Sequence, residues 1–400
     1  MLKKFSNFTI KSLLIFSGAF AGITILFISI FLFKEGLGFF KKPAVEEGYS
    51  LFVNSKNKVE DFDSKKIKEI FDHEITNWSE LGGEDVEILL FRMDNIFDYY
   101  SDEELGEEYE FLAEKLAEVI KAEEGIIAFV PHQYSPAEYS GVKELSVPNI
   151  TPSDFFTGKD WLPTATPSPL FGTLPMLLGT LLVSLVAILF ALPLGLGVAI
   201  YLSELAPEGI RKFLKPIIEL LAGIPSVVYG FFGLVVLAPL VQKTFNLPVG
   251  ETALTGSLIL AIMALPTIIS IAEDAMRNTP RAMKEASLAL GATHWQTIYR
   301  VIIPYSKSGI SAAVVLGIGR AIGETMAVLM VTGNAALMPT SLFDPVRTIP
   351  ATIAAELGEA PSGGAHYQAL FLLGAILFII TLFISIAAEM ISKKKNYKDM

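Results

Sequence analysis

The sequence predicts an all-α polytopic membrane protein with six transmembrane helices, interrupted once by a small α/β domain. Three observations predict this fold class. Hydrophobic residues make up 52% of the 400 residues and charged residues 18%, against about 25% charged residues in an ordinary soluble domain. Six apolar runs are long enough to cross a bilayer, which takes about 20 residues. Finally, residues 34–169 hold 29 Asp and Glu against 13 Lys and Arg, a net charge of −16 in a chain whose total is −11.

The composition also excludes several classes of function. The chain has no cysteine, so it has no disulfide framework, thiolate metal site or cysteine nucleophile. Its four histidines are far apart in the sequence and form no paired-histidine zinc motif; they are His73, His132, His294 and His366. The charged segment is acidic, which is the wrong sign for binding nucleic acid. We therefore expect no metal site and no nucleic-acid partner.

Residues 1–40 are predicted to form an N-terminal transmembrane helix. The run Ser12–Phe33 is free of charge and follows three lysines, at positions 3, 4 and 11. A cleaved signal peptide is the alternative, and Ala19-Phe20-Ala21 resembles its cleavage site. However, the apolar core of a signal peptide is only about 7–15 residues long. The longer run favours a helix that stays in the membrane.

Residues 41–165 are predicted to form the acidic α/β domain. β-Branched and aromatic residues predict three strands, over Tyr49–Val53, Glu87–Phe91 and Ile126–Val130. A short helix is expected around Ile67–Phe71, and apolar spacing predicts one amphipathic helix from Ser101 to Gly125. Its acidic run Asp102–Glu110 is interpreted as a solvated helix face rather than a metal site.

Residues 166–400 are predicted to hold the other five transmembrane helices. The apolar runs are Phe171–Leu202, Pro216–Val241, Thr252–Ile271, Ser308–Thr332 and Tyr367–Ile391. Lysine and arginine collect at both termini and in alternate loops, and such loops lie on the cytoplasmic side. The pattern predicts a multi-pass protein of the cell membrane with both termini in the cytoplasm and the acidic domain outside. Arg347 and Glu356 fall in an outer loop, where solvated charges are expected, with rim residues of a pathway as the alternative.

The loop 274–307 is the longest one predicted on the cytoplasmic side. Thr279 and Pro280 are suited to begin a helix that Gly291 ends. Thr293 and Gln296 have the spacing of a capping box, which predicts a second helix running to Pro304. We expect an elbow of two short helices.

One basic and one acidic residue lie inside the fifth predicted transmembrane run, Ser308–Thr332. Arg320 and Glu324 are four residues apart, so on one continuous helix they share a face and can pair. The same helix contains three glycines (Gly317, Gly319, Gly323), which permit close packing of another helix or close approach of a ligand to the backbone. A charge at this depth costs about 2.5–3.5 kcal/mol on insertion scales, so both should face the protein interior. The residues leave two readings open: an ion pair that fixes helix packing, or an anion site, because the arginine fork suits a tetrahedral oxyanion.

Two sets of residues resemble a known family. Glu285-Ala286-Ser287, with Gly291 six residues after the glutamate and Pro304 thirteen after the glycine, resembles the EAA loop of ABC-importer permeases. Residues 219–233 and 319–328 are similar to the permease subunits of phosphate ABC transporters. The resemblance implies a type I importer fold. It assigns the substrate pathway to Arg320, Glu324 and Thr325, and coupling to an ATPase to Glu285, Ala286, Gly291 and Pro304.

The function that the resemblance implies is the transmembrane permease of an ATP-driven phosphate importer. The implied partners are a sister permease (a different chain or a second copy), two cytoplasmic ATPase subunits and an extracytoplasmic phosphate-binding protein. The sequence lacks a phosphate-binding loop of the Gly-x-x-x-x-Gly-Lys-Ser/Thr type. The chain is therefore expected not to be an enzyme and to bind no cofactor, with ATP and magnesium on the partner. The alternatives are a permease for another oxyanion, such as sulfate or molybdate, and a membrane receptor with an outer sensing domain.

The acidic domain itself resembles part of a phosphate-binding protein, through residues 68–83 and 125–131. In those proteins an arginine after the second strand precedes a Ser-Gly-Thr at a helix start. Here Arg92 precedes Met93-Asp94-Asn95. We therefore expect a lobe that does not bind phosphate, and that docks or mimics the binding protein. Arg92 as an anion ligand is the alternative.

Overall fold

The computed structural model describes residues 2–60 and 63–393 and divides into two compact units. The membrane unit comprises residues 1–32, 174–359 and 370–400, and the inserted unit comprises residues 33–173 and 360–369. Lys394, Lys395 and Lys398 of the basic C-terminal tail lie outside the described residues.

The inserted unit contains a four-stranded sheet in the order β2-β3-β1-β4. Its strands are β1 (Tyr49–Asn54), β2 (Leu89–Arg92), β3 (Ile126–Pro131) and β4 (Val142–Glu144). Strand β1 pairs antiparallel with β3 and β4, whereas β2 pairs parallel with β3. The three predicted strands are present, and β4 was missed because it is only three residues long.

Helices pack on both faces of this sheet because its side chains alternate. Leu51 and Val53 of β1 belong to one buried cluster with α2 (Ser64–Phe71). Phe52, between them, belongs to another with α4 (Leu112–Ala122). The smaller elements are α3 (Asp102–Leu105), α5 (Pro152–Thr157), the pair β5 (Trp161–Leu162) and β6 (Leu170–Phe171), and 3₁₀ turns at Phe39–Lys41, Trp78–Leu81, Met93–Asp98 and His132–Tyr134.

The single amphipathic helix predicted from Ser101 to Gly125 is wrong. Helix α3 stops at Leu105, and α4 begins only at Leu112. Between them Gly106 has φ +90° and Tyr109 has φ +56°, backbone conformations that no right-handed helix contains. The apolar spacing continues across the break, so periodicity alone did not reveal it.

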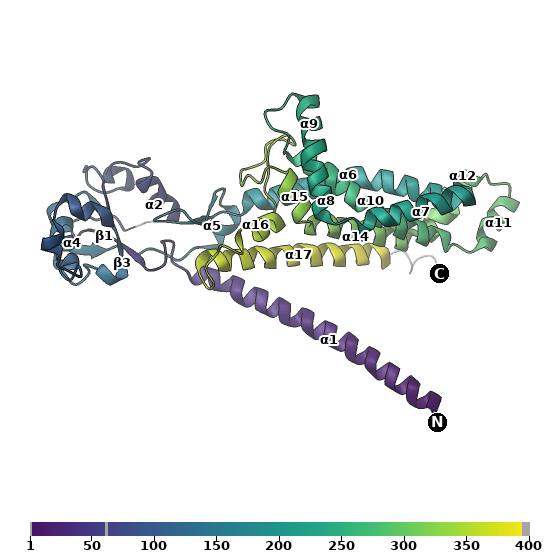
Figure 1. The fold of residues 1–400 in the computed structure, drawn as a ribbon, viewed down its shortest axis with the longest axis horizontal. Helices are drawn as coiled ribbons and strands as arrows, with labels where there is room; N and C mark the ends of the chain where they lie inside the picture. The colour runs from purple at the N-terminus through teal and green to yellow at the C-terminus, as the bar shows by residue number, and fades with distance from the viewer. Residues whose placement is uncertain (1, 61–62, 394–400) are drawn as a thin grey trace. The chain divides into compact units, whose positions relative to one another are not determined.

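The membrane unit is helical (Figure 1). Among the described residues, five helices or helix pairs are long and apolar enough to cross a membrane: α1 (Leu2–Gly38), α6 (Leu174–Ile200), α8 with α9 (Ser226–Phe232 and Ala238–Phe245), α10 (Ala253–Arg277) and α17 (Ala365–Lys393). A sixth span results only when α14 (Lys307–Gly323) is taken together with the helical segment His294–Tyr305 before it, from which it is bent by 72°. Each of the six predicted apolar runs thus corresponds to one of these helices.

The third predicted run, Pro216–Val241, begins too early. Residues 208–223 form a separate amphipathic helix, α7 (Glu208–Gly223). The chain then turns at Ile224 and Pro225, and α8 begins at Ser226. Proline disfavours the helical conformation in the residue before it, and Ile224 is extended (φ −69°, ψ 129°), which ends α7.

Helices α6, α10 and α14 pack together at the centre of the membrane unit. Their close approach depends on glycine. A Cβ added at Gly195 of α6 or at Gly317 of α14 would lie 2.8 Å from the side chain of Ile268 in α10. This packing fixes the helix that carries Arg320 against α10.

Candidate functional site

Arg320 lies in the last turn of α14 and is partly buried. Its Nη1 is 3.5 Å from the hydroxyl of Thr267 in α10, a long hydrogen bond. This bond joins the end of α14 to α10.

The expected pairing of Arg320 with Glu324 on one continuous helix is wrong. Helix α14 ends at Gly323, Glu324 is extended (φ −69°, ψ 133°), and the short helix α15 (Met326–Val331) follows Thr325. The Glu324 carboxylate instead accepts a hydrogen bond of 3.4 Å from the N–H of Ala327, and the Thr325 hydroxyl donates to the carbonyl of Gly323. A free N–H at the start of a helix attracts a carboxylate, and this interaction replaces the ion pair.

This break leaves Arg320 without a carboxylate partner among the residues that the structure describes. Gly323 lies on the same helix face, three residues after Arg320, and Gly319 directly precedes Arg320 in the chain. A Cβ added at either glycine would meet no atom within 4 Å. Because a guanidinium group carries five N–H donors, the site offers donors and positive charge beside an open glycine surface. Gly317, by contrast, serves helix packing.

The loop 274–307 forms the predicted elbow. Its first helix is α11 (Arg281–Ala289), and Gly291 follows with φ +85°. A capping box between Thr293 and Gln296 opens α12 (His294–Thr297). A π-helical turn (Ile298–Ile302) and α13 (Ile303–Tyr305) complete the second arm.

Thr279 does not cap the first helix of the elbow, as the sequence had suggested. Pro280 occupies the N-cap position, and the helix begins at Arg281. The hydroxyl of Thr279 is buried and lies 3.1 Å from that of Ser306, beyond the second arm. Ser306 also donates to the carbonyl of Ala275 in α10. Buried hydroxyl groups need hydrogen-bond partners, and these bonds supply them. They also connect the two ends of the elbow to each other.

The four elbow residues singled out from the sequence (Glu285, Ala286, Gly291, Pro304) are all exposed. Two further side chains at the elbow were missed: Leu290 is 90% exposed and Trp295 is 59% exposed. Large apolar side chains exposed together mark an interaction surface. The available signal was their position close to the glycine turn, Leu290 directly before Gly291 and Trp295 four residues after it.

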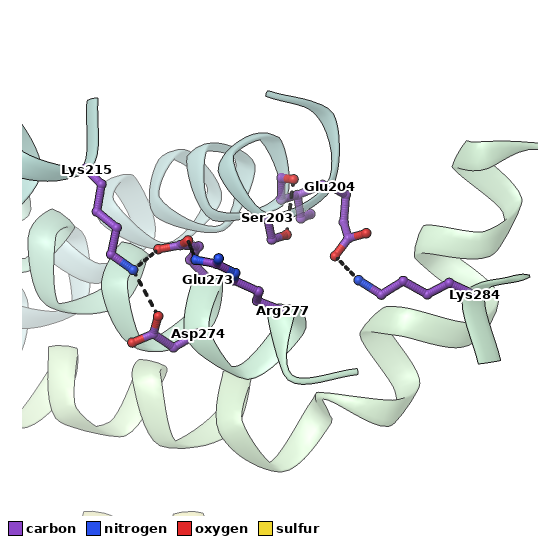
Figure 2. Close-up of polar contacts among 8 residues, drawn as sticks. Ser203, Glu204, Lys215, Glu273, Asp274, Arg277 and Lys284 are labelled. Atoms are coloured by element: carbon purple, nitrogen blue, oxygen red, sulfur yellow. Dashed lines mark hydrogen bonds and ion pairs between the residues drawn. The ribbon is translucent and has the colours of Figure 1, made fainter. Parts of the chain in front are cut away.

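Two groups of ion pairs lie near the elbow, and Figure 2 shows both. Lys215 of α7 contacts Glu273 at 2.8 Å and Asp274 at 3.0 Å, both in α10. The hydrogen bond to Glu273 raises the pKa of the Lys215 amine, against the opposing effect of burial. In the second group, Lys284 of α11 contacts Glu204 at 2.7 Å. From the sequence, Lys215 and Lys284 were interpreted only as markers of the cytoplasmic side.

Arg347 and Glu356 are not solvated loop charges. Their side chains form an ion pair of 2.5 Å and are only 19% and 16% exposed. The Nε of Arg347 also donates to the backbone carbonyl and the side-chain oxygen of Asn334, at 3.0 Å each. The ion pair therefore joins the segment before α16 (Ile349–Glu356) to the end of that helix, and the bonds to Asn334 tie the same segment to the turn after α15.

Arg92 in the inserted unit lies at the end of β2 and is exposed. Its guanidinium carbon is 5.6 Å from the centre of the Phe71 ring. Its backbone N–H donates to the side chain of Asn95, in the short turn that replaces the Ser-Gly-Thr of the binding proteins. The described residues contain no group of three or more His, Cys, Asp or Glu placed to hold a metal ion.

Comparison with known proteins shows the family to which this chain belongs. Residues 191–397 match the model of the family described as binding-protein-dependent transport system inner membrane component. This match covers the elbow, α14 and α15. The chain belongs to this family, and it is a multi-pass membrane protein and the permease subunit of an importer, not an enzyme.

Individual relatives indicate a narrower group of permeases within this family. The chain is 41% identical over 256 residues to the probable ABC transporter permease protein YqgH of Bacillus subtilis, covering 64% of this chain and 82% of that protein. It is 44% identical over 259 residues to the phosphate transport system permease protein PstC of Mesorhizobium japonicum, covering 60% and 78%. Among solved structures, it is similar to a chain of the MetNI methionine ABC transporter in an inward-facing conformation, with TM-score 0.44, 19% identity and coverage of 55% and 96%. The sequence resemblance to phosphate permeases is thus confirmed.

Proposed function

We propose that this permease carries phosphate and that Arg320 binds it on its way through the membrane. The observation that supports this most directly is the guanidinium group of Arg320, which has one long hydrogen bond to Thr267 and no carboxylate partner among the described residues. Open space next to Gly319 and Gly323, on the same helix, leaves room near it for a ligand. Arginine stays charged at every physiological pH and its fork matches the oxygens of a phosphate ion. Relatives named as phosphate permeases support the choice of anion.

Glu324 and Thr325 complete the proposed pathway by shaping the break after Arg320. The carboxylate of Glu324 is engaged by the N–H of Ala327, so it does not neutralise the arginine. Its negative charge lies near Arg320 and weakens the binding of an anion there. Weaker binding favours transport because the substrate must also be released. The hydroxyl of Thr325 donates to the carbonyl of Gly323 at 3.2 Å, and we propose that it exchanges this partner for an oxyanion oxygen.

Coupling to ATP hydrolysis is assigned to the elbow. Glu285, Ala286, Gly291 and Pro304 lie on its exposed surface, with Leu290 and Trp295 beside them. We propose that this surface docks into one of two cytoplasmic ATPase subunits, and that a sister permease forms the other half of the pathway. In this assembly ATP and magnesium bind the ATPase chains, and this chain binds no cofactor.

An extracytoplasmic binding protein is the proposed source of phosphate, in keeping with the family to which the chain belongs. The acidic inserted unit repels an anion, so its proposed role is docking or mimicking that protein rather than holding phosphate. Uptake of radiolabelled phosphate by vesicles that contain the purified complex tests the function. It should require both internal ATP and the external binding protein, and uptake of equal rate without either would contradict the proposal.

The proposed orientation places both termini and the elbow in the cytoplasm and the inserted unit outside. Because the chain has no cysteine, a single introduced cysteine reports its own side of the membrane. We expect a membrane-impermeant maleimide to label Glu108→Cys in intact cells and Lys212→Cys only after the membrane is opened; both positions are exposed. Labelling of Lys212→Cys in intact cells, with Glu108→Cys protected, would reverse the orientation.

A further inference from the structure

One ion pair joins the elbow to a transmembrane helix. The Nζ of Lys284, in α11, lies 2.7 Å from Oε1 of Glu204, and Figure 2 shows the two side chains pointing toward each other. Their side chains are only 21% and 11% exposed. Glu204 belongs to the π-helical turn Tyr201–Leu205 that continues directly from α6. The pair therefore connects the first arm of the elbow to the end of a central helix.

Little else holds α11 to the membrane-spanning helices. None of the residues of α11 is buried. Its other described side-chain bond, from Ser287 to Thr297 at 3.0 Å, stays within the elbow. Among the described residues, the contact between Lys284 and Glu204 is the one side-chain hydrogen bond or ion pair from α11 to a spanning helix.

The Glu204 end of the pair is fixed in place. Leu202, two residues earlier, is 1% exposed, and the N–H of Ala206 closes the turn on the carbonyl of Tyr201 at 2.7 Å. Single π-helical turns occur often at functional sites, where the wider turn redirects a side chain. Here the turn presents a shielded carboxylate to the elbow.

We propose that the ion pair between Glu204 and Lys284 is the positioning contact that transmits movement of the elbow to α6; this rests on the proposed coupling function. Separating two shielded charges leaves each without a counterion in a poorly solvated place, which is strongly unfavourable. The elbow and the end of α6 therefore move together when an ATPase displaces the elbow. The pair between Lys215 and Glu273 holds α7 to α10 and does not involve the elbow.

The test uses the complete complex in vesicles and measures ATP hydrolysis and phosphate uptake together. We expect Lys284→Met and Glu204→Gln each to keep ATP hydrolysis within about twofold of wild type while phosphate uptake falls at least tenfold. The double variant Glu204→Lys with Lys284→Glu restores the pair with its charges exchanged, and should return uptake to within about threefold of wild type. A residue that merely supports folding would not show this uncoupling and rescue.

The matched control is Lys212→Met, because Lys212 also forms a 2.8 Å ion pair, with Glu208, but both side chains are more than 70% exposed. It should leave uptake within twofold. Uptake per ATP at the wild-type level in Lys284→Met overturns the inference, as does a charge-exchanged variant that assembles but stays uncoupled. If Lys284→Met does not assemble, the charge-exchanged variant decides between the two outcomes. Absence of phosphate uptake by the wild-type complex would instead contradict the proposed function itself.

Discussion

Replacing Arg320 with alanine is expected to lower phosphate uptake at least a hundredfold while the complex still assembles. The substitution removes the charge and all the donors of a guanidinium group that has no carboxylate partner among the described residues. Each hydrogen bond to a charged group contributes roughly 1.5–3 kcal/mol, and 1.4 kcal/mol is a factor of ten. Loss of two such bonds accounts for the expected effect. Packing should survive because Gly317, not Arg320, makes the close contact with Ile268.

The measurement is the initial rate of radiolabelled phosphate uptake, with assembly followed by size-exclusion chromatography. Arg320→Lys keeps the charge but loses the planar fork, so it should fall between wild type and Arg320→Ala. Lys243→Ala, which removes an exposed cation from α9, serves as the control and should transport normally. Unchanged uptake by Arg320→Ala would remove Arg320 from the pathway.

The second large effect is expected from Gly291→Val in the elbow. Gly291 has φ +85°, and a β-branched residue in such a conformation is a strong outlier. The turn must change, which displaces Leu290 and Trp295 from the exposed surface proposed to contact the ATPase. We expect loss of both ATPase binding and phosphate uptake, by at least tenfold each.

Gly363→Val provides a matched control for this prediction. Gly363 also has positive φ, +80°, and a Cβ at either glycine would meet no atom within 4 Å. The two substitutions therefore impose a similar backbone penalty at different places. Co-purification with the ATPase should fail for Gly291→Val alone. Equal loss in both variants would point to general destabilisation rather than to the elbow.

Much of the fold could be predicted from the sequence because apolar length and alternation are local properties. Six apolar runs predicted six helices, and three β-branched runs predicted β1, β2 and β3. The errors fall where a local backbone change interrupts a continuing pattern. Gly106 splits the acidic helix, and Pro225 separates α7 from α8. Neither change alters the apolar composition from which the elements were predicted.

The candidate site was predictable in its residues but not in its geometry. Arg320 was conspicuous because a charge inside an apolar run is rare. Its position relative to Glu324 could not be predicted. A spacing of four residues brings two side chains together only on a continuous helix, and α14 ends at Gly323. The contact between Lys284 and Glu204 joins residues 80 positions apart, and such a separation carries no signal in a single sequence. Tertiary packing alone brings them together.

Competition between anions tests the central claim most directly, namely that this permease carries phosphate. Vesicles that contain the complex, its binding protein outside and ATP inside would take up radiolabelled phosphate in the presence of excess unlabelled phosphate, sulfate or molybdate. The account predicts that unlabelled phosphate suppresses uptake at least tenfold, while sulfate and molybdate change it by less than twofold. Equal suppression by sulfate or molybdate, or faster uptake of labelled sulfate than of phosphate, would contradict it.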